Sequence, residues 1–254
     1  MKALQTKIGF LKFLRNIQIL NLCHADEFIY WGHLGLGDQI SSAKLFEHWS
    51  SSKRTVHVPC KSRNIENLST IFGYLEGVRF HPISDDPKHE KKQVRELAKK
   101  LKLPIVNSGR ECLTYMQNRF PSEGLNVALM RGAGLRTAGL FSQNFRTHVL
   151  SLPQITPPNG NYIFINQTTS KGVVDIPSVD EPSENRGEIV YPNPESRLYE
   201  HASLIDNAQE LQSVGSAFMC LALVLGARPP IKKHFLRYPL LTDDPDCSWK
   251  AGNP

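Results

Sequence analysis

From Phe28 onward, short runs of β-branched and aromatic residues alternate with segments of helical periodicity. The first unit has a strand-like run over residues 28–31 and another over residues 55–58. Between them, Ile40, Ala43 and Phe46 fall on one helical face. Parallel strands need a crossover segment between them, and a helix usually supplies it. The alternation therefore predicts an α/β protein with a parallel sheet covered by helices.

The same alternation continues and then starts again after a turn-rich segment. Further strand-like runs cover residues 78–83, 105–106, 162–165, 188–191 and 211–214, with helical patterns over 65–75, 94–101, 198–208 and 218–225. Residues 152–160 contain several prolines and an Asn-Gly turn, which typically end regular elements and here predict a domain boundary.

A chain of 254 residues is long enough for two modest lobes that each bury a core. The sequence therefore predicts two Rossmann-like lobes with parallel sheets covered by helices, over residues 27–152 and 153–254, the second including a C-terminal tail. A basic segment, residues 1–26, precedes them.

The distribution of charge argues against a nucleic-acid partner. The net charge is +6, but much of the excess lies before the first acid, Asp26, in Lys2, Lys7, Lys12 and Arg15. No run of Lys and Arg interleaved with aromatics follows it. Charges also interrupt residues 1–22 too often for a signal peptide or membrane span, although a weak contact with a membrane surface stays open as an alternative.

The cysteines indicate a reducing compartment. All 5 are scattered, and none forms a C-x-x-C pair or a Cys/His spacing suited to zinc. We therefore expect a cytoplasmic protein without a structural metal.

The run H-L-G-L-G-D, His33 to Asp38, lies between a predicted strand and a predicted helix, where glycines allow a tight turn. It lacks both the third glycine of a dinucleotide fingerprint and the Gly-Lys-Ser/Thr of a phosphate-binding P-loop, which disfavours NAD and ATP chemistry. Taken alone, Asp38 has two interpretations, a helix N-cap or a catalytic carboxylate, and His33 is either a turn residue or a catalyst.

Two later runs complete a pattern: Y-I-F-I-N-Q-T-T-S-K-G from Tyr162 and L-I-D-N-A-Q-E-L-Q-S-V-G-S-A-F-M-C-L-A from Leu204. In this order, the three runs resemble the signatures of a GT-B-like glycosyltransferase group that is distantly similar to the heptosyltransferases and other cell-surface-glycan transferases. The resemblance extends from about residue 28 to about residue 238.

The resemblance implies transfer of a sugar from a nucleotide-sugar donor to a glycan or other hydroxyl acceptor, with inversion. No Asp-x-Asp motif follows a predicted strand, so we expect no metal, and the nucleotide sugar is a substrate rather than a cofactor. Asp38 matches the acid that accepts the acceptor's proton, and His33 stands beside it. The expected donor and phosphate site lies in the cleft between the lobes. Its residues are Gly35, Gly37, Asn166, Thr168, Thr169, Ser170, Lys171, Gly215, Ser216 and Ala217.

The chain also departs from the family pattern. Asn166-Gln167 stands where the family usually has His-Asp, and Lys171-Gly172 where it has Arg-Gly. These departures leave a second hypothesis open, a noncatalytic relative that binds a nucleotide or glycan. A third hypothesis, a basic membrane or nucleic-acid adaptor, rests only on the N-terminal cations.

Overall fold

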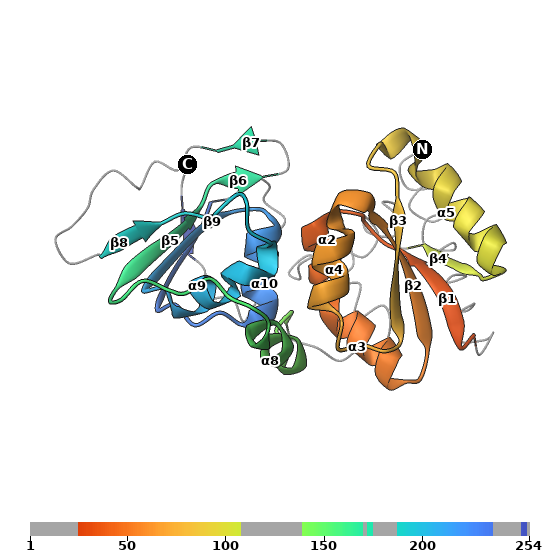
Figure 1. Ribbon diagram of the computed structural model, residues 1–254, viewed down its shortest axis with the longest axis horizontal. Helices are drawn as coiled ribbons and strands as arrows, with labels where there is room; N and C mark the ends of the chain where they lie inside the picture. Colours follow the sequence, from red (N-terminus) through yellow and green to blue (C-terminus); the bar gives the residue numbers. More distant parts are fainter. Residues whose placement is uncertain (1–24, 108–138, 170–171, 175–186, 236–249, 253–254) are drawn as a thin grey trace, which may run out of the picture. The chain divides into compact units, whose positions relative to one another are not determined.

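The structure is a computed structural model that describes residues 25–107, 139–169, 172–174, 187–235 and 250–252. The chain divides into two compact units, residues 1–137 and 138–254. Figure 1 shows that each unit contains a sheet with helices packed against it. Residues 1–24 of the basic segment lie outside the described residues.

Unit 1 is built on a four-stranded sheet in the order β3-β2-β1-β4, with every neighbouring pair parallel. Its strands are β1 (Glu27–Trp31), β2 (Thr55–Lys61), β3 (Val78–Ile83) and β4 (Ile105–Asn107). Its helices are α2 (Leu36–Ile40), α3 (Ala43–Ser51), the 3-10 turn η1 (Ser62–Asn64), α4 (Ile65–Ile71) and α5 (Pro87–Leu101).

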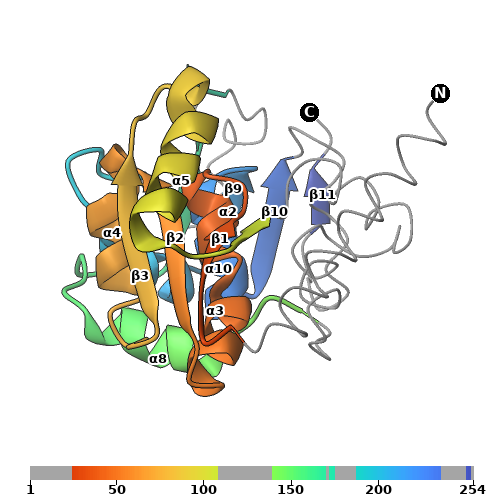
Figure 2. The same cartoon turned by 90° about the vertical axis from the view of Figure 1, so that its right-hand side faces the viewer.

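Side chains of opposite faces of this sheet meet different helices, as a Rossmann-like lobe requires. On one face, Phe28 packs edge-on against Trp49 of α3, with ring centroids 5.1 Å apart, and Phe46 packs against Phe72 after α4. On the other face, Ile29 and Val94 of α5 belong to one buried apolar cluster. Figures 1 and 2 show the sheet between α5 and the α2–α4 layer.

A polar cluster crosses three strands on the α5 face. The buried His57 is 2.7 Å from Glu27 Oε1 through Nε2 and 2.7 Å from His81 Nε2 through Nδ1. Both ring nitrogens of His57 are therefore hydrogen-bonded. Burial and the neighbouring charge of His57 lower the pKa of His81.

Unit 2 has a five-stranded sheet in the order β11-β10-β9-β5-β8, again parallel throughout. Its strands are β5 (Tyr162–Asn166), β8 (Glu188–Val190), β9 (Glu210–Val214), β10 (Ile231–Phe235) and β11 (Lys250–Gly252), with a separate hairpin of β6 (Thr168–Thr169) and β7 (Gly172–Val173). Its helices are α8 (Gln143–Ser151), η3 (Leu198–His201), α9 (Ala202–Asn207) and α10 (Ala217–Leu225).

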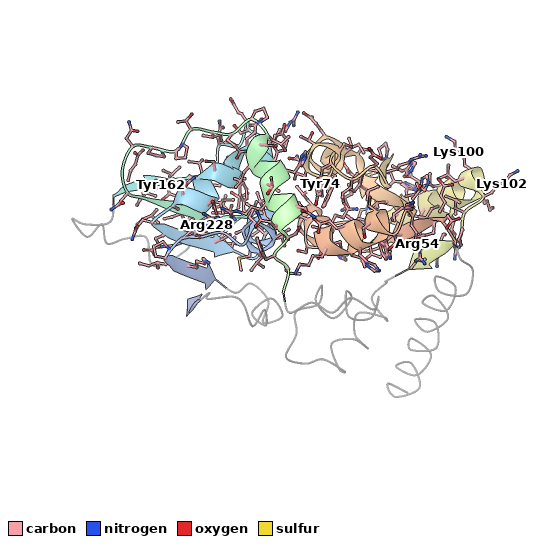
Figure 3. All side chains as sticks on the ribbon, turned by 90° about the horizontal axis from the view of Figure 1, so that it is seen from below. Arg54, Tyr74, Lys100, Lys102, Tyr162 and Arg228 are labelled. Carbon is pink, nitrogen blue, oxygen red and sulfur yellow. The ribbon has the colours of Figure 1, made fainter. Side chains whose placement is uncertain are left out.

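Residues of β5 alternate between two apolar environments. Tyr162, labelled in Figure 3, donates its hydroxyl to the carbonyl of Leu204 in α9 at 2.9 Å. Ile163 and Ile165 point the other way and pack with Val214. Helix α10 is almost wholly apolar because it lies in the core of this unit. The two parallel sheets confirm the predicted α/β class with Rossmann-like lobes.

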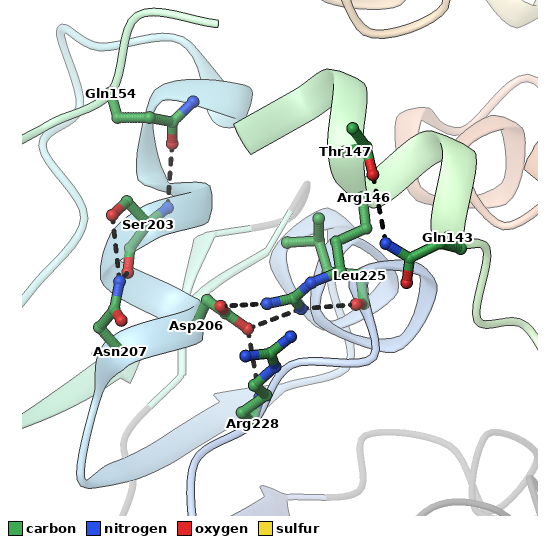
Figure 4. A network of polar contacts seen from close by, with 9 residues as sticks. All are labelled: Gln143, Arg146, Thr147, Gln154, Ser203, Asp206, Asn207, Leu225 and Arg228. Carbon is green, nitrogen blue, oxygen red and sulfur yellow. Dashed lines mark hydrogen bonds and ion pairs between the residues drawn. The ribbon is translucent and has the colours of Figure 1, made fainter. Parts of the chain in front are cut away.

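The division between the units falls before α8, between residues 137 and 138, whereas the sequence predicts it near residues 152–160. A buried ion pair between Arg146 of α8 and Asp206 of α9 explains why α8 belongs to unit 2, and Arg146 also donates to the carbonyl of Leu225 (Figure 4). The turn-rich segment itself is bonded to unit 2 as well, since Ile155 donates its amide to Glu200.

The helix expected around residues 40–46 is interrupted. Ser41 Oγ donates to the carbonyl of Gly37 at 2.9 Å, and Ser42 Oγ donates to that of Asp38 at 3.0 Å. Such side-chain bonds to the preceding turn compete with the helical ladder, and here α2 ends and α3 begins at these two serines. Within the described residues, no helix is long and apolar enough to span a membrane.

Candidate functional site

The strand orders locate a favoured binding edge in each sheet. In unit 1 the chain runs outward from β1 to β2 and β3, then returns to place β4 on the other side of β1. In unit 2, β8 and β9 likewise flank β5 on opposite sides. Ligands of open parallel sheets bind at the carboxyl ends of strands where the order reverses. We therefore expect binding and catalytic residues in the segments that follow β1, β5 and β9.

After β1, a tight turn brings His33 and Asp38 together. Their side chains form a hydrogen bond of 2.6 Å between His33 Nδ1 and Asp38 Oδ2. Gly35, rather than Asp38, is the N-cap of α2, so the N-cap interpretation of Asp38 does not hold. Asp38 lies in the first turn of the short helix and directs its carboxylate at the histidine.

The pair is accessible and electrostatically coupled. The His33 side chain is 69% exposed and that of Asp38 is 38% exposed. The hydrogen bond to Asp38 raises the pKa of His33, helped by the charges of Asp38 and Glu90 and opposed by burial and Lys61. A raised pKa keeps the imidazole a stronger base than a free histidine near neutral pH.

Gln39 attaches α2 to the sheet. Its side chain is almost fully buried, and its Nε2 donates to the carbonyl of Pro59 in β2 at 2.8 Å. This bond lies where β1 and β2 have stopped pairing, since their register ends at Ile29 and His57. The side-chain amide of Gln39 thus holds helix α2, which carries Asp38, against the end of β2.

In unit 2, Asn166 joins the carboxyl ends of β5 and β9. It has no exposed surface, and its Nδ2 donates to Ser216 Oγ at 2.8 Å and to Ser213 Oγ at 3.2 Å. The amide of Thr168 donates to Asn166 Oδ1 at 3.2 Å. Because a backbone N–H can only donate, this contact requires the oxygen on that side and the NH₂ group toward the serines.

This orientation of the Asn166 side chain makes the Ser216 oxygen an acceptor. The hydroxyl accepts a hydrogen bond from Asn166, so its own proton is available to another acceptor, and the described part of the chain records no partner for that proton. Ser216 is the N-cap residue of α10 but makes no side-chain cap bond. The first amides of α10 also lack partners within the helix. Residues 215–218 are half-buried and hence accessible.

The other expected donor residues divide into three groups. Gly215 and Ala217 flank Ser216 at the start of α10, and Thr168 is exposed beside Asn166. The hydroxyl of Thr169 donates to the carbonyl of Gly172 at 2.9 Å and closes the β6–β7 hairpin. Ser170 and Lys171 lie outside the described residues.

Gly35 and Gly37, which were expected near the donor phosphates, lie in unit 1 with Asp38, whereas Asn166 and Ser216 lie in unit 2. Sequence reasoning did not single out Ser213 or Gln39. A serine within a buried strand and a glutamine within a helix carry no local signal, since their partners come from other elements.

Comparison with known proteins identifies a similar solved structure. No protein-family model and no curated protein matches the chain. Among solved structures, the chain is similar to the E. coli heptosyltransferase WaaC with ADP-2-deoxy-2-fluoro heptose, at 14% sequence identity and a TM-score of 0.44, over 82% of this chain and 88% of that one. The fold assignment rests on the two parallel sheets described above.

Proposed function

We propose that this chain transfers a sugar from a nucleotide-sugar donor to a hydroxyl of a glycan or other acceptor. Unit 2 binds the donor diphosphate at the β5–β9 edge, and the His33–Asp38 pair of unit 1 supplies the proton acceptor. The observation that supports the proposal most is the orientation of the Ser216 hydroxyl, whose proton has no acceptor among the described residues and lies at the start of helix α10.

A departing nucleoside diphosphate requires compensation for its charge. The amino end of a helix carries partial positive charge and unbonded amides, so it suits a phosphate. Helix α10 presents this end at the point where the strand order of its sheet reverses. With a hydroxyl and amides fixed in place before the reaction, the leaving group is stabilised without reorganisation.

The acceptor requires a base, because a sugar hydroxyl is a poor nucleophile. A proton acceptor within hydrogen-bond reach assists its attack on the anomeric carbon while the diphosphate leaves. The accessible His33–Asp38 pair has the chemistry for this step. Direct displacement of this kind inverts the configuration at the anomeric carbon.

The donor site can be tested with a pair of serine variants. Ser216→Ala removes the free hydroxyl proton but no cap bond, so we expect it to weaken binding of a nucleoside diphosphate about tenfold or more and to leave the uncharged nucleoside unaffected. The control, Ser142→Ala, removes a cap bond of 3.2 Å to the amide of Phe145 in the same unit. It should lower stability by about 1 kcal/mol without changing nucleotide affinity.

Calorimetric titration and thermal unfolding of both variants measure the two effects. Equal loss of nucleoside and nucleoside-diphosphate binding in Ser216→Ala contradicts the phosphate site.

A second function, binding without catalysis, is favoured by one observation. Asn166 is a buried neutral amide at a position where the family pattern has a titratable pair. Nucleotide binding stabilises such a protein against unfolding, but the protein does not cleave a nucleotide sugar and so releases no nucleotide from it. Nucleotide release therefore separates the two functions.

A further inference from the structure

Residue 35 is a glycine because the Asp38 carboxylate occupies the space that a Cβ atom would fill, and not because the backbone there needs the conformational freedom of glycine. Its φ of −66° and ψ of 141° are open to any residue. A Cβ at this position, however, would lie 2.4 Å from Asp38 Oδ2 and 3.4 Å from His33 Nδ1. The absence of a side chain at residue 35 is thus what allows the carboxylate to reach the imidazole.

The hydrogen bond also fixes the tautomer of His33. An ionised carboxylate can only accept, so Nδ1 of His33 carries the hydrogen that bonds Asp38. In the neutral ring, the lone pair then lies on Nε2. The side chain is 69% exposed, and the described residues provide no partner for Nε2.

The surroundings strengthen this nitrogen as a base. Besides Asp38, the carboxylate of Glu90 raises the pKa of His33, while burial and Lys61 lower it. Glu90 is held by a 3.0 Å hydrogen bond from Trp31 Nε1 at the end of β1. The two carboxylates therefore make the His33 imidazole a stronger base than that of a free histidine.

Asp38 is already engaged with the histidine. Its Oδ2 is bonded to the ring at 2.6 Å, and transfer of positive charge to that ring is stabilised by the carboxylate. A histidine oriented through Nδ1 by a carboxylate, with Nε2 facing the substrate, is the arrangement in which the carboxylate orients and the imidazole moves the proton.

We propose that His33 Nε2 is the atom that takes the acceptor's hydroxyl proton and that Asp38 is its positioning residue; this rests on the transfer reaction proposed above. The proton moves from the hydroxyl to Nε2 as the oxygen forms its bond to the anomeric carbon. The bond from that carbon to the diphosphate oxygen breaks, and its electron pair leaves with the nucleoside diphosphate. The imidazolium then returns its proton to solvent.

Three variants test the parts that His33, Asp38 and Gly35 play in this step. His33→Asn keeps an N–H near the position of Nδ1 and removes the part of the ring that carries Nε2, so turnover should fall about 10²- to 10⁴-fold. Asp38→Asn keeps the ring but removes the carboxylate that fixes its tautomer, and turnover should fall comparably. Gly35→Ala keeps both groups but separates them, and roughly a tenfold to hundredfold loss follows from misplacement of the ring.

His89→Asn is the matched control. This histidine is also exposed and stands 3.6 Å from a carboxylate, that of Asp86, but outside the β1–α2 turn. Its replacement should leave turnover and its pH dependence unchanged.

The decisive readouts are the pH profile of turnover and the titration of the His33 ring by NMR. In the wild type, the acid limb of turnover should coincide with the ring titration above pH 6.5, and in Gly35→Ala both should move to lower pH. Near-normal turnover in His33→Asn, or an acid limb near pH 4 typical of a carboxylate, would overturn the assignment. Absence of wild-type turnover with every nucleotide sugar overturns the proposed function and this base together.

Discussion

Asn166→Asp tests the donor site by reversing one hydrogen bond without changing side-chain volume. The Asn166 amide donates to Ser216 at 2.8 Å, whereas a carboxylate there can only accept. The new carboxylate can accept hydrogen bonds from the Thr168 N–H and the Ser216 hydroxyl, which favour its ionised form, whereas the Ser213 hydroxyl already donates to the carbonyl of Val214 at 3.0 Å. The Ser216 hydroxyl then donates its proton to residue 166, so it can no longer donate a hydrogen bond to the phosphate.

The size of the effect follows from that one bond. A hydrogen bond to a charged group contributes about 1.5–3 kcal/mol, which corresponds to roughly a tenfold to hundredfold weaker Kd for a nucleoside diphosphate. Repulsion between the new carboxylate and the phosphate adds to the loss. Binding of the uncharged nucleoside should change little, since it makes neither contact.

Calorimetric titration of Asn166→Asp, Ser216→Ala and the double variant measures the coupling. If Asn166 acts through the Ser216 hydroxyl, the loss in the double variant is smaller than the sum of the single losses. Additive losses, or an Asn166→Asp variant with wild-type affinity for the diphosphate, would refute the reasoning.

Three further predictions concern stability and metal dependence. Arg146→Met leaves the buried Asp206 carboxylate without its ion-pair partner and should destabilise unit 2 by about 3–5 kcal/mol in urea unfolding, whereas Arg146→Met with Asp206→Leu should regain most of it. Burial lowers the pKa of His81, so the unfolded chain takes up a proton at higher pH than the folded chain. Stability should therefore fall as pH drops below about 6.5, and less so in His81→Gln, when urea midpoints at pH 7.5 and 5.5 are compared; an equal fall excludes His81. Transfer activity should persist in EDTA, because fixed dipoles stabilise the leaving group; loss in EDTA with recovery on adding magnesium shows a metal site.

Local patterns were sufficient to predict the four strands of the first sheet, strands β5, β8 and β9 of the second, and the turn that carries His33 and Asp38, whereas β10 and β11 were not predicted. The strand-like run over residues 162–165 lies within β5, all five residues of which are buried, because buried parallel strands are continuous apolar or β-branched runs. Helix α10 was also predicted from its apolar run. These elements could be predicted because the residue pattern that defines each one lies within a short stretch of sequence.

Features that depend on distant partners were not predictable. Arg146 pairs with a residue 60 positions away, and the segment that contains it has weak helical periodicity, so α8 was missed. The bond between Asn166 and Ser216, 50 positions apart, shows why a residue expected to bind phosphate is instead buried behind the hydroxyl. Likewise, the need for glycine at residue 35 follows from the position of the Asp38 carboxylate and not from the turn.

The most direct test of sugar transfer is nucleotide release from a panel of nucleotide sugars, measured for the wild type and Asp38→Asn alongside their affinities for the matching nucleoside diphosphate. We predict slow release by the wild type with at least one donor even without acceptor, and in Asp38→Asn an unchanged affinity with release lowered about 10²- to 10⁴-fold. Nucleotide binding without release from any donor, or wild-type release by Asp38→Asn, would contradict the account.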